Sequence, residues 1–160
     1  MKDSSVKMLT KSAMIAALYA VLTLASHGLG LANGQIQIRL SEALTILPVF
    51  TPAAIPGLFV GCILSNILTG AAIPDIIFGS LATLLGALGS RALKSNKYLA
   101  VIPPIAANTV IIPLLLFYIY GIVPLWLSFI TVFAGEIVSA GVLAILLYNG
   151  ISKNRDRLSL

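Results

Sequence analysis

Long apolar stretches alternate along this chain with short segments that contain most of its polar residues. A helix that crosses a bilayer needs roughly 20 predominantly apolar residues. The pattern therefore predicts an all-α integral membrane protein with six transmembrane helices, in a single domain over residues 1–160. The expected helices cover about residues 11–29, 40–52, 54–69, 74–93, 98–120 and 124–149.

The second expected helix is short for a crossing and contains Pro48. A segment that enters and leaves on one side is its alternative. The basic residues favour a crossing, because loops rich in Lys and Arg stay on the cytoplasmic side. An even number of crossings must then separate any two basic clusters, and six crossings place both termini in the cytoplasm. The clusters are Lys2/Lys7/Lys11, Arg91/Lys94/Lys97 and Lys153/Arg155/Arg157.

Composition agrees with a membrane location. The chain is 59% hydrophobic and 9% charged, whereas an ordinary soluble domain has about 25% charged residues. Its net charge of +5 does not indicate nucleic acid binding, because the positive charge follows the loops rather than one folded face. The apolar stretch 13–25 resembles a signal peptide, but no clear small-x-small cleavage site follows it before His27. We therefore expect an uncleaved first helix.

The sequence offers little for catalysis. It has one cysteine, Cys62, and one histidine, His27, so neither an internal disulfide nor a metal cluster is expected. No nucleophile and base stand at a recognisable spacing, and no phosphate-binding glycine motif with a lysine occurs. We expect no enzyme, no cofactor, no bound metal and no ATP hydrolysis by this chain.

Small residues at four-residue spacing mark the first expected helix, as the pairs Ala13/Ala17 and Ala16/Ala20. Such spacing lets helix backbones approach closely in lipid, which provides no hydrophobic drive for association. Packing within the bundle is the ordinary use of these faces. Docking to another membrane protein is the alternative.

Charged and amide residues are costly at membrane depth, so they normally face a cavity or a partner. Arg39 and Glu42 stand three residues apart and share one helix face, where they form an ion pair, line an outward-facing pocket, or both. Asp75 follows Pro74 at a helix start, so a capping role is its alternative. The full set of such candidates is Arg39, Glu42, Asn66, Asp75, Asn108 and Glu136.

An aromatic stripe precedes Glu136 in the last helix, formed by Trp126, Phe129 and Phe133. The spacing i, i+3, i+7, i+10 places these four residues on one face. A carboxylate beside aromatic walls suits a flat, nitrogen-rich ligand, because it accepts two N–H bonds while rings stack on the ligand plane. A protonated Glu136, or one paired with Arg39, is the alternative.

Several runs of the sequence resemble the QueT family over nearly the whole chain. They are Gly34-Gln35-Ile36-Gln37-Ile38-Arg39-Leu40-Ser41-Glu42 and its continuation to Cys62, then Asp75-Ile76-Ile77-Phe78-Gly79, and the later Gly135-Glu136. These proteins are substrate-binding S components of energy-coupling factor (ECF) transporters. The resemblance implies a six-helix S-component bundle in a prokaryotic plasma membrane. It also implies an outward-facing pocket capped by the loop between the first two helices.

The resemblance further implies partners and a ligand. A small-residue surface on the first helix docks a transmembrane coupling subunit, for which Ala13/Ala17 or Ala16/Ala20 fit, and two ATPase subunits complete the complex. The cargo is a queuosine precursor, a planar deazaguanine such as preQ1 or preQ0, or queuine. Its N1–H and exocyclic amine match a carboxylate, and its O6 needs a donor such as Arg39, Gln37 or an asparagine.

A cationic aminomethyl group on the ligand would require a second carboxylate, and the sequence offers Glu42, Asp75 and Glu136 without ordering them. Three other functions stay open. They are an S component for another vitamin-like molecule, a structural or regulatory membrane subunit without cargo, and an intramembrane enzyme.

Overall fold

The computed structural model describes residues 2–31 and 37–154 of the chain. These residues form only helices and the turns that join them, so the expected all-α fold is confirmed for the described part. The expected polar loop 32–37 lies mostly outside the described residues, as do Arg155 and Arg157 of the third basic cluster. The elements are α1 (Lys2–Gly28), η1 (Leu40–Val49), α2 (Ala54–Leu68), α3 (Ile73–Ala92), α4 (Lys97–Ala100), α5 (Ile102–Tyr118), α6 (Leu125–Glu136), η2 (Ile137–Leu143) and α7 (Ala144–Lys153).

Four stretches of the described chain are long and apolar enough to cross a membrane, which supports the expected multi-pass arrangement. They are Ser4–Gly28, Ile73–Ala92, Lys97–Tyr118 and Leu125–Lys153. Two shorter apolar helices, Leu40–Val49 and Ala54–Leu68, complete the bundle. The last long stretch is continuous from α6 through η2 to α7.

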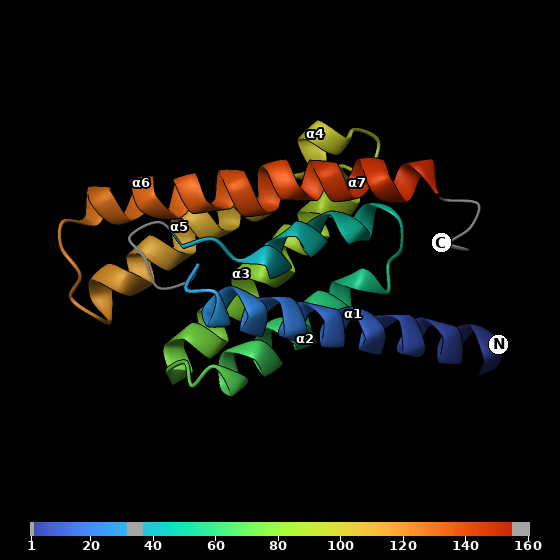
Figure 1. Ribbon diagram of the computed structural model, residues 1–160, viewed down its shortest axis with the longest axis horizontal. Coiled ribbons are helices and arrows are strands. Elements are labelled where there is room, and N and C mark those ends of the chain that lie inside the picture. Colours follow the sequence, from blue (N-terminus) through green and yellow to red (C-terminus); the bar gives the residue numbers. More distant parts are fainter. Residues whose placement is uncertain (1, 32–36, 155–160) are drawn as a thin grey trace.

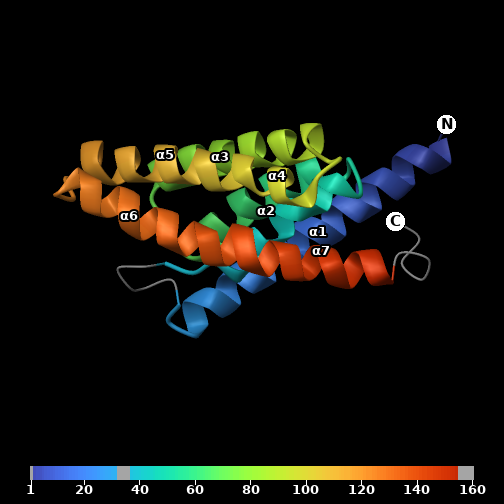
Figure 2. The same ribbon diagram turned by 90° about the horizontal axis from the view of Figure 1, so that it is seen from above.

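The helices lie roughly along one long axis, and the start of α1 and the end of α7 lie at the same end of the bundle. Figure 1 shows the N-terminal end of α1 and the C-terminal end of α7 at the same right-hand end, and Figure 2 agrees from above. At this end α4 contacts α7, because Lys97 Nζ donates to Asn149 Oδ1 at 2.7 Å. The turn between α2 and α3 lies at the opposite end. We call the end with the start of α1 and the end of α7 the basic end, because Lys7, Lys11 and Lys153 belong to these helix ends.

The helix boundaries differ from the expected ones in four places. The expected helix 98–120 is divided into α4 (Lys97–Ala100) and α5 (Ile102–Tyr118). α1 begins at Lys2 rather than near residue 11, because no Gly or Pro interrupts its polar first turns. The second helix is a 3₁₀-helix that ends at Val49 rather than near residue 52. The last helix reaches Lys153 instead of residue 149 and contains the π-helical turn η2.

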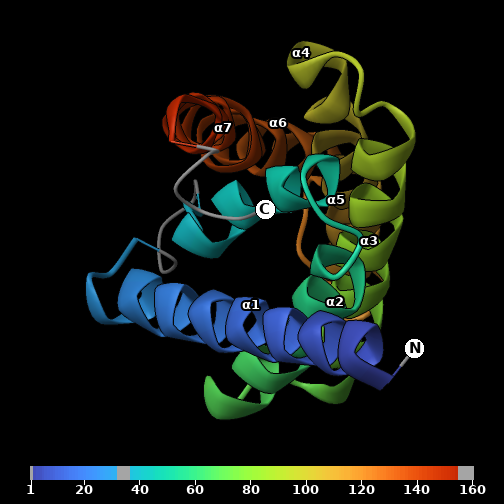
Figure 3. The same ribbon diagram turned by 90° about the vertical axis from the view of Figure 1, so that its right-hand side faces the viewer.

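The 3₁₀-helix η1 lies at the centre of the bundle, where Figure 3 shows it in teal between α1, α3 and α7. A 3₁₀-helix rises about 2.0 Å per residue. Ten residues therefore extend roughly 20 Å, less than the ~30 Å hydrocarbon core of a bilayer. Its C-terminal carbonyls are capped by Arg91, whose Nη1 donates to the oxygens of Pro48 and Val49 at 3.0 and 3.3 Å. Being enclosed by protein, η1 does not expose these carbonyls to lipid.

Glycines on α2 bring its backbone against α1. A Cβ at Gly57 would lie 2.8 Å from the Ser12 carbonyl oxygen, and one at Gly61 would lie 3.0 Å from the Ala16 carbonyl oxygen. Ala16 and Ala20 are accordingly buried within the bundle. This burial favours packing within the bundle over docking to a partner for the pair Ala16 and Ala20.

The other small pair on α1 points outward. Ala13 and Ala17 are both exposed. Leu9 and Val21 are also exposed on this helix, at 71% and 61%. The structure therefore separates the two alanine pairs, one packing inside the bundle and the other facing the membrane.

Candidate functional site

A polar cavity opens between η1 and the helices α3, α5 and α6. It has an outer chamber of about 370 Å³ and an inner chamber of about 40 Å³. Five residues line both chambers, so the two chambers adjoin each other: Gln37, Arg39, Gly79, Ile112 and Val132. The inner chamber adds Glu42, Thr83, Asn108 and Glu136. The outer chamber adds His27, Asn66, Thr69, Ala71, Asp75, Leu116, Tyr120, Ile122 and Thr131.

All the charged and amide candidates singled out from the sequence line this cavity. The inner chamber holds Glu42, Asn108 and Glu136, whereas the outer chamber holds Asn66 and Asp75. Gln37 and Arg39 line both. The side chains come from η1, α2, α3, α5, α6 and the segment before η1, so the fold brings together residues up to 99 positions apart, from Gln37 to Glu136.

The segment that carries Gln37 and Arg39 is held by backbone contacts on both sides. It crosses α6 at Gly135, where an added Cβ would overlap the Gln37 carbonyl oxygen. The Arg39 N–H donates to Ser139 Oγ at 3.1 Å, and the Leu40 N–H donates to Ser26 Oγ at 2.9 Å. Gly135 therefore permits the close approach that brings Arg39 to the cavity.

The π-helical turn η2 begins directly after Glu136 and contains Ser139. Turns of this kind inside α-helices are rare and occur frequently at functional sites. Here the turn lies where α6 meets the segment 37–39, since Ser139 accepts the Arg39 N–H. The irregular turn therefore lies directly beside the inner chamber.

Glu42 is one of two carboxylates in the inner chamber. Only 2% of it is exposed, and its Oε1 accepts a hydrogen bond from the Tyr19 hydroxyl of α1. Its other oxygen, Oε2, is buried and has no hydrogen-bond partner among the described residues. The sequence suggested an ion pair with Arg39, but the neighbour that bonds this carboxylate is Tyr19.

Glu136 is the second carboxylate, and among the described residues again one of its oxygens accepts a hydrogen bond and the other does not. Its Oε1 accepts from Asn108 Nδ2 at 3.1 Å, and its Oε2 is buried without a partner in the described chain. An unpaired buried acceptor costs roughly 1–3 kcal/mol. Two such oxygens, from η1 and α6, line one small chamber, which indicates a place where a hydrogen-bond donor binds.

Asp75 lies in the first turn of α3, but it is not the N-cap, which is Ala72. Its carboxylate accepts a hydrogen bond from the exposed Tyr120 hydroxyl, and this bond raises the pKa of Tyr120 above its ordinary value. Asn66 Nδ2 donates to the Asp75 backbone oxygen at 3.2 Å. These contacts join the α2–α3 turn to the end of α5 at the edge of the outer chamber.

The aromatic stripe of α6 does not reach the cavity. Trp126 and Phe133 are 63% and 47% exposed, and Phe129 lines neither chamber. The face of α6 that points inward contains Ser128, Thr131, Val132, Gly135 and, in η2, Ser139. Glu136 lies at the border between the two faces. Trp126 and Phe133 therefore point outward, and none of the three aromatic side chains belongs to the described lining of the cavity.

Some site residues could not be found by reading the sequence. Tyr19 lies in an alanine-rich helix, where a tyrosine is ordinarily a packing residue. Tyr120 is predicted to belong to the interfacial belt. Ser139 lies in an apolar stretch without a local signal. Their roles depend on contacts made across long sequence separations, and no local spacing encodes them.

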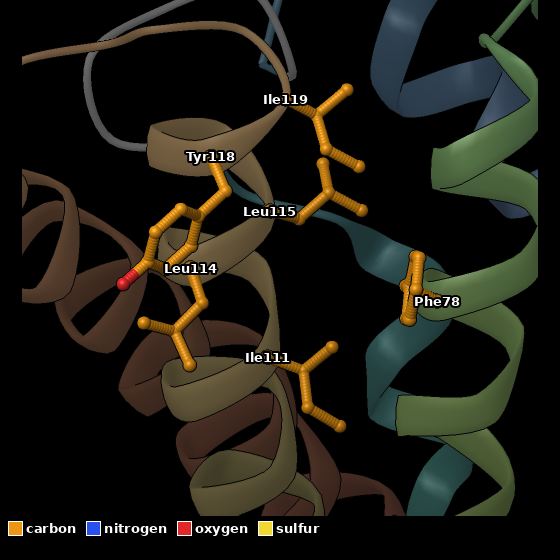
Figure 4. Close-up of a pocket in the computed structure, with 6 residues that line it drawn as sticks. All are labelled: Phe78, Ile111, Leu114, Leu115, Tyr118 and Ile119. Carbon is orange, nitrogen blue, oxygen red and sulfur yellow. The ribbon is translucent and has the colours of Figure 1, made fainter.

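A second pocket of about 310 Å³ lies between α3 and α5 and is apolar. Figure 4 shows Phe78 of α3 facing Ile111, Leu115 and Ile119 across the gap. Leu114 and Tyr118 complete its lining. It contains no carboxylate, amide or guanidinium, so it lacks the polar groups that orient a nitrogen-rich ligand.

Comparison with known proteins gives a family and one relative. A model described as the QueT transporter family matches residues 9–153. A protein of Lactococcus lactis subsp. cremoris (strain MG1363), named queuosine precursor transporter QueT, is 35% identical over 85 residues. That match covers 53% of this chain and 50% of the relative, so the chain spans about half the length of the curated relative it matches. No solved structure matches the chain.

Proposed function

Because the chain belongs to the QueT transporter family, we propose that it is the substrate-binding subunit of an importer for a queuosine precursor. Membership of a transporter family agrees with the expectation that the chain is not an enzyme. The observation that carries the proposal is the polar cavity, in which two buried carboxylates each present one oxygen that no described residue pairs. A nitrogen-rich ligand supplies the donors that these oxygens lack.

The outer chamber accommodates the planar ring of such a ligand. Its volume of about 370 Å³ falls within the roughly 300–1,000 Å³ of ordinary small-molecule sites. Arg39 and Gln37 supply N–H donors for the O6 oxygen of a deazaguanine, and Asp75 supplies an acceptor at the rim. The rim residues Gln37, Tyr120 and Ile122 are exposed, which gives the ligand a way in.

The chain is a multi-pass protein of the prokaryotic cell membrane, and we propose that it crosses this membrane six times with both termini in the cytoplasm. At the basic end, Lys7 lies near the start of α1, Lys153 is the last residue of α7, and Lys97 donates to Asn149 of α7. Such residues collect on the cytoplasmic side. The cavity then opens outward. η1 contributes a crossing although it is short, because α1, α3 and α7 enclose it.

We propose further that the subunit acts as an S component of an ECF-type transporter. ATP hydrolysis then occurs in two partner ATPases, and a transmembrane coupling subunit docks on the exposed pair Ala13 and Ala17. Leucine at both positions should block close helix approach and abolish uptake, while the purified chain still binds its precursor. Uptake at the normal rate by this double variant would remove the docking assignment.

A matched control distinguishes docking from folding. Ala16→Leu places bulk against the backbone of α2 at Gly61. Such overpacking typically costs about 1–3 kcal/mol. This variant should lower the thermal midpoint of the purified chain, whereas leucine at the outward-facing Ala13 and Ala17 should not.

The function itself is tested by ligand binding. Protein purified gently from cells that make queuosine precursors should carry a deazaguanine in native mass spectrometry. Calorimetry with added precursors should show saturable binding to the ligand-free chain, and guanosine, which carries a ribose and lacks the substituent of the deazaguanine ring, should bind more weakly. Absence of any deazaguanine binding in both measurements would overturn the proposed function.

A further inference from the structure

We propose that the inner chamber is a binding site for a primary ammonium group, held between Glu42 and Glu136. The inference rests on the proposed function for the identity of the ligand, a planar base that carries this group as a short substituent. It assigns the ring to the outer chamber and the cationic substituent to the inner one. This orientation differs from the sequence-based expectation that Glu136 accepts the N–H edge of the base.

The available acceptors favour an ammonium group over the edge of a ring. An edge with two parallel N–H groups needs both oxygens of one carboxylate. Oε1 of Glu42 already accepts from Tyr19, and Oε1 of Glu136 already accepts from Asn108. Among the described residues, each carboxylate therefore keeps a single oxygen without a hydrogen-bond partner, Oε2. An ammonium group has three donors that point in different directions, so it can bond two separate oxygens at once.

Charge balance favours the same ligand group. The inner chamber contains two carboxylates and one guanidinium, that of Arg39. The uncharged Tyr19 hydroxyl and Asn108 amide complete the polar groups bonded to the carboxylates. With both carboxylates ionised, Arg39 compensates only one of them. An uncompensated charge is costly in a buried site, and a ligand cation between Glu42 and Glu136 supplies the missing positive charge.

The dimensions agree with this division of the ligand. The inner chamber has a volume of about 40 Å³, and one water molecule requires roughly 10–15 Å³ of such volume. An aminomethyl group, with two heavy atoms, fits this space, whereas a fused bicyclic ring does not. A nitrile of the same length also fits, so size alone does not discriminate between an amine and a nitrile. Charge and hydrogen-bond donors do.

The test compares two ligands of matched shape on the wild-type chain in lipid nanodiscs. One is 7-aminomethyl-7-deazaguanine (preQ1) and the other is 7-cyano-7-deazaguanine (preQ0). Calorimetry should give a dissociation constant about tenfold to hundredfold lower for the amine, because only the amine makes charge-assisted bonds to the two free oxygens. Equal or tighter binding of the nitrile would overturn the inference and leave the proposed function standing. Binding of neither ligand would overturn the proposed function.

Substitutions then test whether Glu42 and Glu136 hold the ammonium group. Glu42→Gln and Glu136→Gln each keep the side-chain shape and should reduce the amine-to-nitrile ratio of affinities to within about threefold of unity. Asp75→Asn changes a carboxylate of the outer chamber only, so the ratio should stay at its wild-type value even where both affinities fall. A ratio unchanged in both glutamate variants would move the ammonium site out of the inner chamber. The wild-type comparison stands by itself if a variant fails to fold.

Discussion

Two pockets of similar volume use the same two helices, and they differ in what lines them. Phe78 and Gly79 are consecutive on α3, and Ile111 and Ile112 are consecutive on α5; the first of each pair lines the apolar pocket and the second lines the polar cavity. The volumes are about 310 and 370 Å³. Volume therefore does not identify the site.

Unmet hydrogen-bonding capacity distinguishes the two pockets. The polar cavity contains buried carboxylate oxygens that lack a hydrogen-bond partner in the part of the chain that the structure describes. The apolar pocket lies among exposed residues such as Phe78 and Tyr118, which lipid chains solvate as well as protein does. Substitutions in the cavity should therefore change ligand affinity, and substitutions in the apolar pocket should not.

The largest effect is expected from the double variant Glu42→Gln/Glu136→Gln. It removes both carboxylates of the inner chamber while keeping the acceptor oxygens used by Tyr19 and Asn108. Charge-assisted hydrogen bonds are worth about 1.5–3 kcal/mol each. Losing two should weaken binding of 7-aminomethyl-7-deazaguanine by roughly two orders of magnitude or more, measured by calorimetry. Retained affinity in a folded double variant would contradict the assignment of the cavity.

A smaller effect is expected from Gly135→Ala, which touches no ligand directly. The new Cβ would overlap the Gln37 carbonyl oxygen, so the segment that carries Arg39 must move. We expect binding to weaken by about tenfold, an effect of ~1.4 kcal/mol. Gly150→Ala is the matched control, because nothing lies within 4 Å of a Cβ at Gly150. Equal affinities for the two alanine variants would show that the close approach at Gly135 does not position the site.

Tyr120→Phe should have a still smaller effect. The variant removes the hydroxyl that donates to the Asp75 carboxylate at the rim, where Tyr120 is 42% exposed. A hydrogen bond typically contributes about 0.5–1.5 kcal/mol, and less where water can replace it. Calorimetry should therefore show no more than about a fivefold loss of affinity. A loss as large as that of the double glutamate variant would place the main ligand contacts at the rim.

No effect on affinity is expected from Phe78→Leu or Leu114→Ala. Both side chains line the apolar pocket and neither lines the polar cavity. The dissociation constant should stay within about twofold of the wild-type value, the ordinary spread for substitutions at independent sites. A tenfold loss in either variant would show that the ligand binds in the apolar pocket and not in the polar cavity.

The polar residues that line the cavity could be selected from the sequence. A charged or amide side chain within an apolar stretch must find a cavity or a partner. Arg39, Glu42, Asn108 and Glu136 could therefore be selected without knowing the fold, and the structure brings them to one inner chamber. All-α architecture followed in the same way from the length of the apolar stretches.

The direction in which the aromatic stripe of α6 points could not be predicted from the sequence, for a related physical reason. In a soluble protein an apolar face points to the core, but in a membrane both faces of a helix are apolar. Periodicity placed Trp126, Phe129 and Phe133 on one side of α6 without telling which side faces lipid. The glycine and serine residues of the opposite side, Gly135 and Ser139, mark the inward face.

The form of the second helix could not be predicted either. The sequence of η1 is short, apolar and contains Pro48, which is compatible with several helical forms. In the structure, η1 is enclosed by α1, α3 and α7 and is capped by Arg91, which lies 43 residues beyond Pro48. Such long-range contacts leave no trace in local composition.

A structure determined with 7-aminomethyl-7-deazaguanine bound tests the central claim most directly. The ring should occupy the outer chamber beside Arg39, with its amine within about 2.7–3.2 Å of Glu42 Oε2 and Glu136 Oε2, the ordinary range for such hydrogen bonds. Ligand density between Phe78 and Ile119, or a ring whose amine points away from both glutamates, would contradict it.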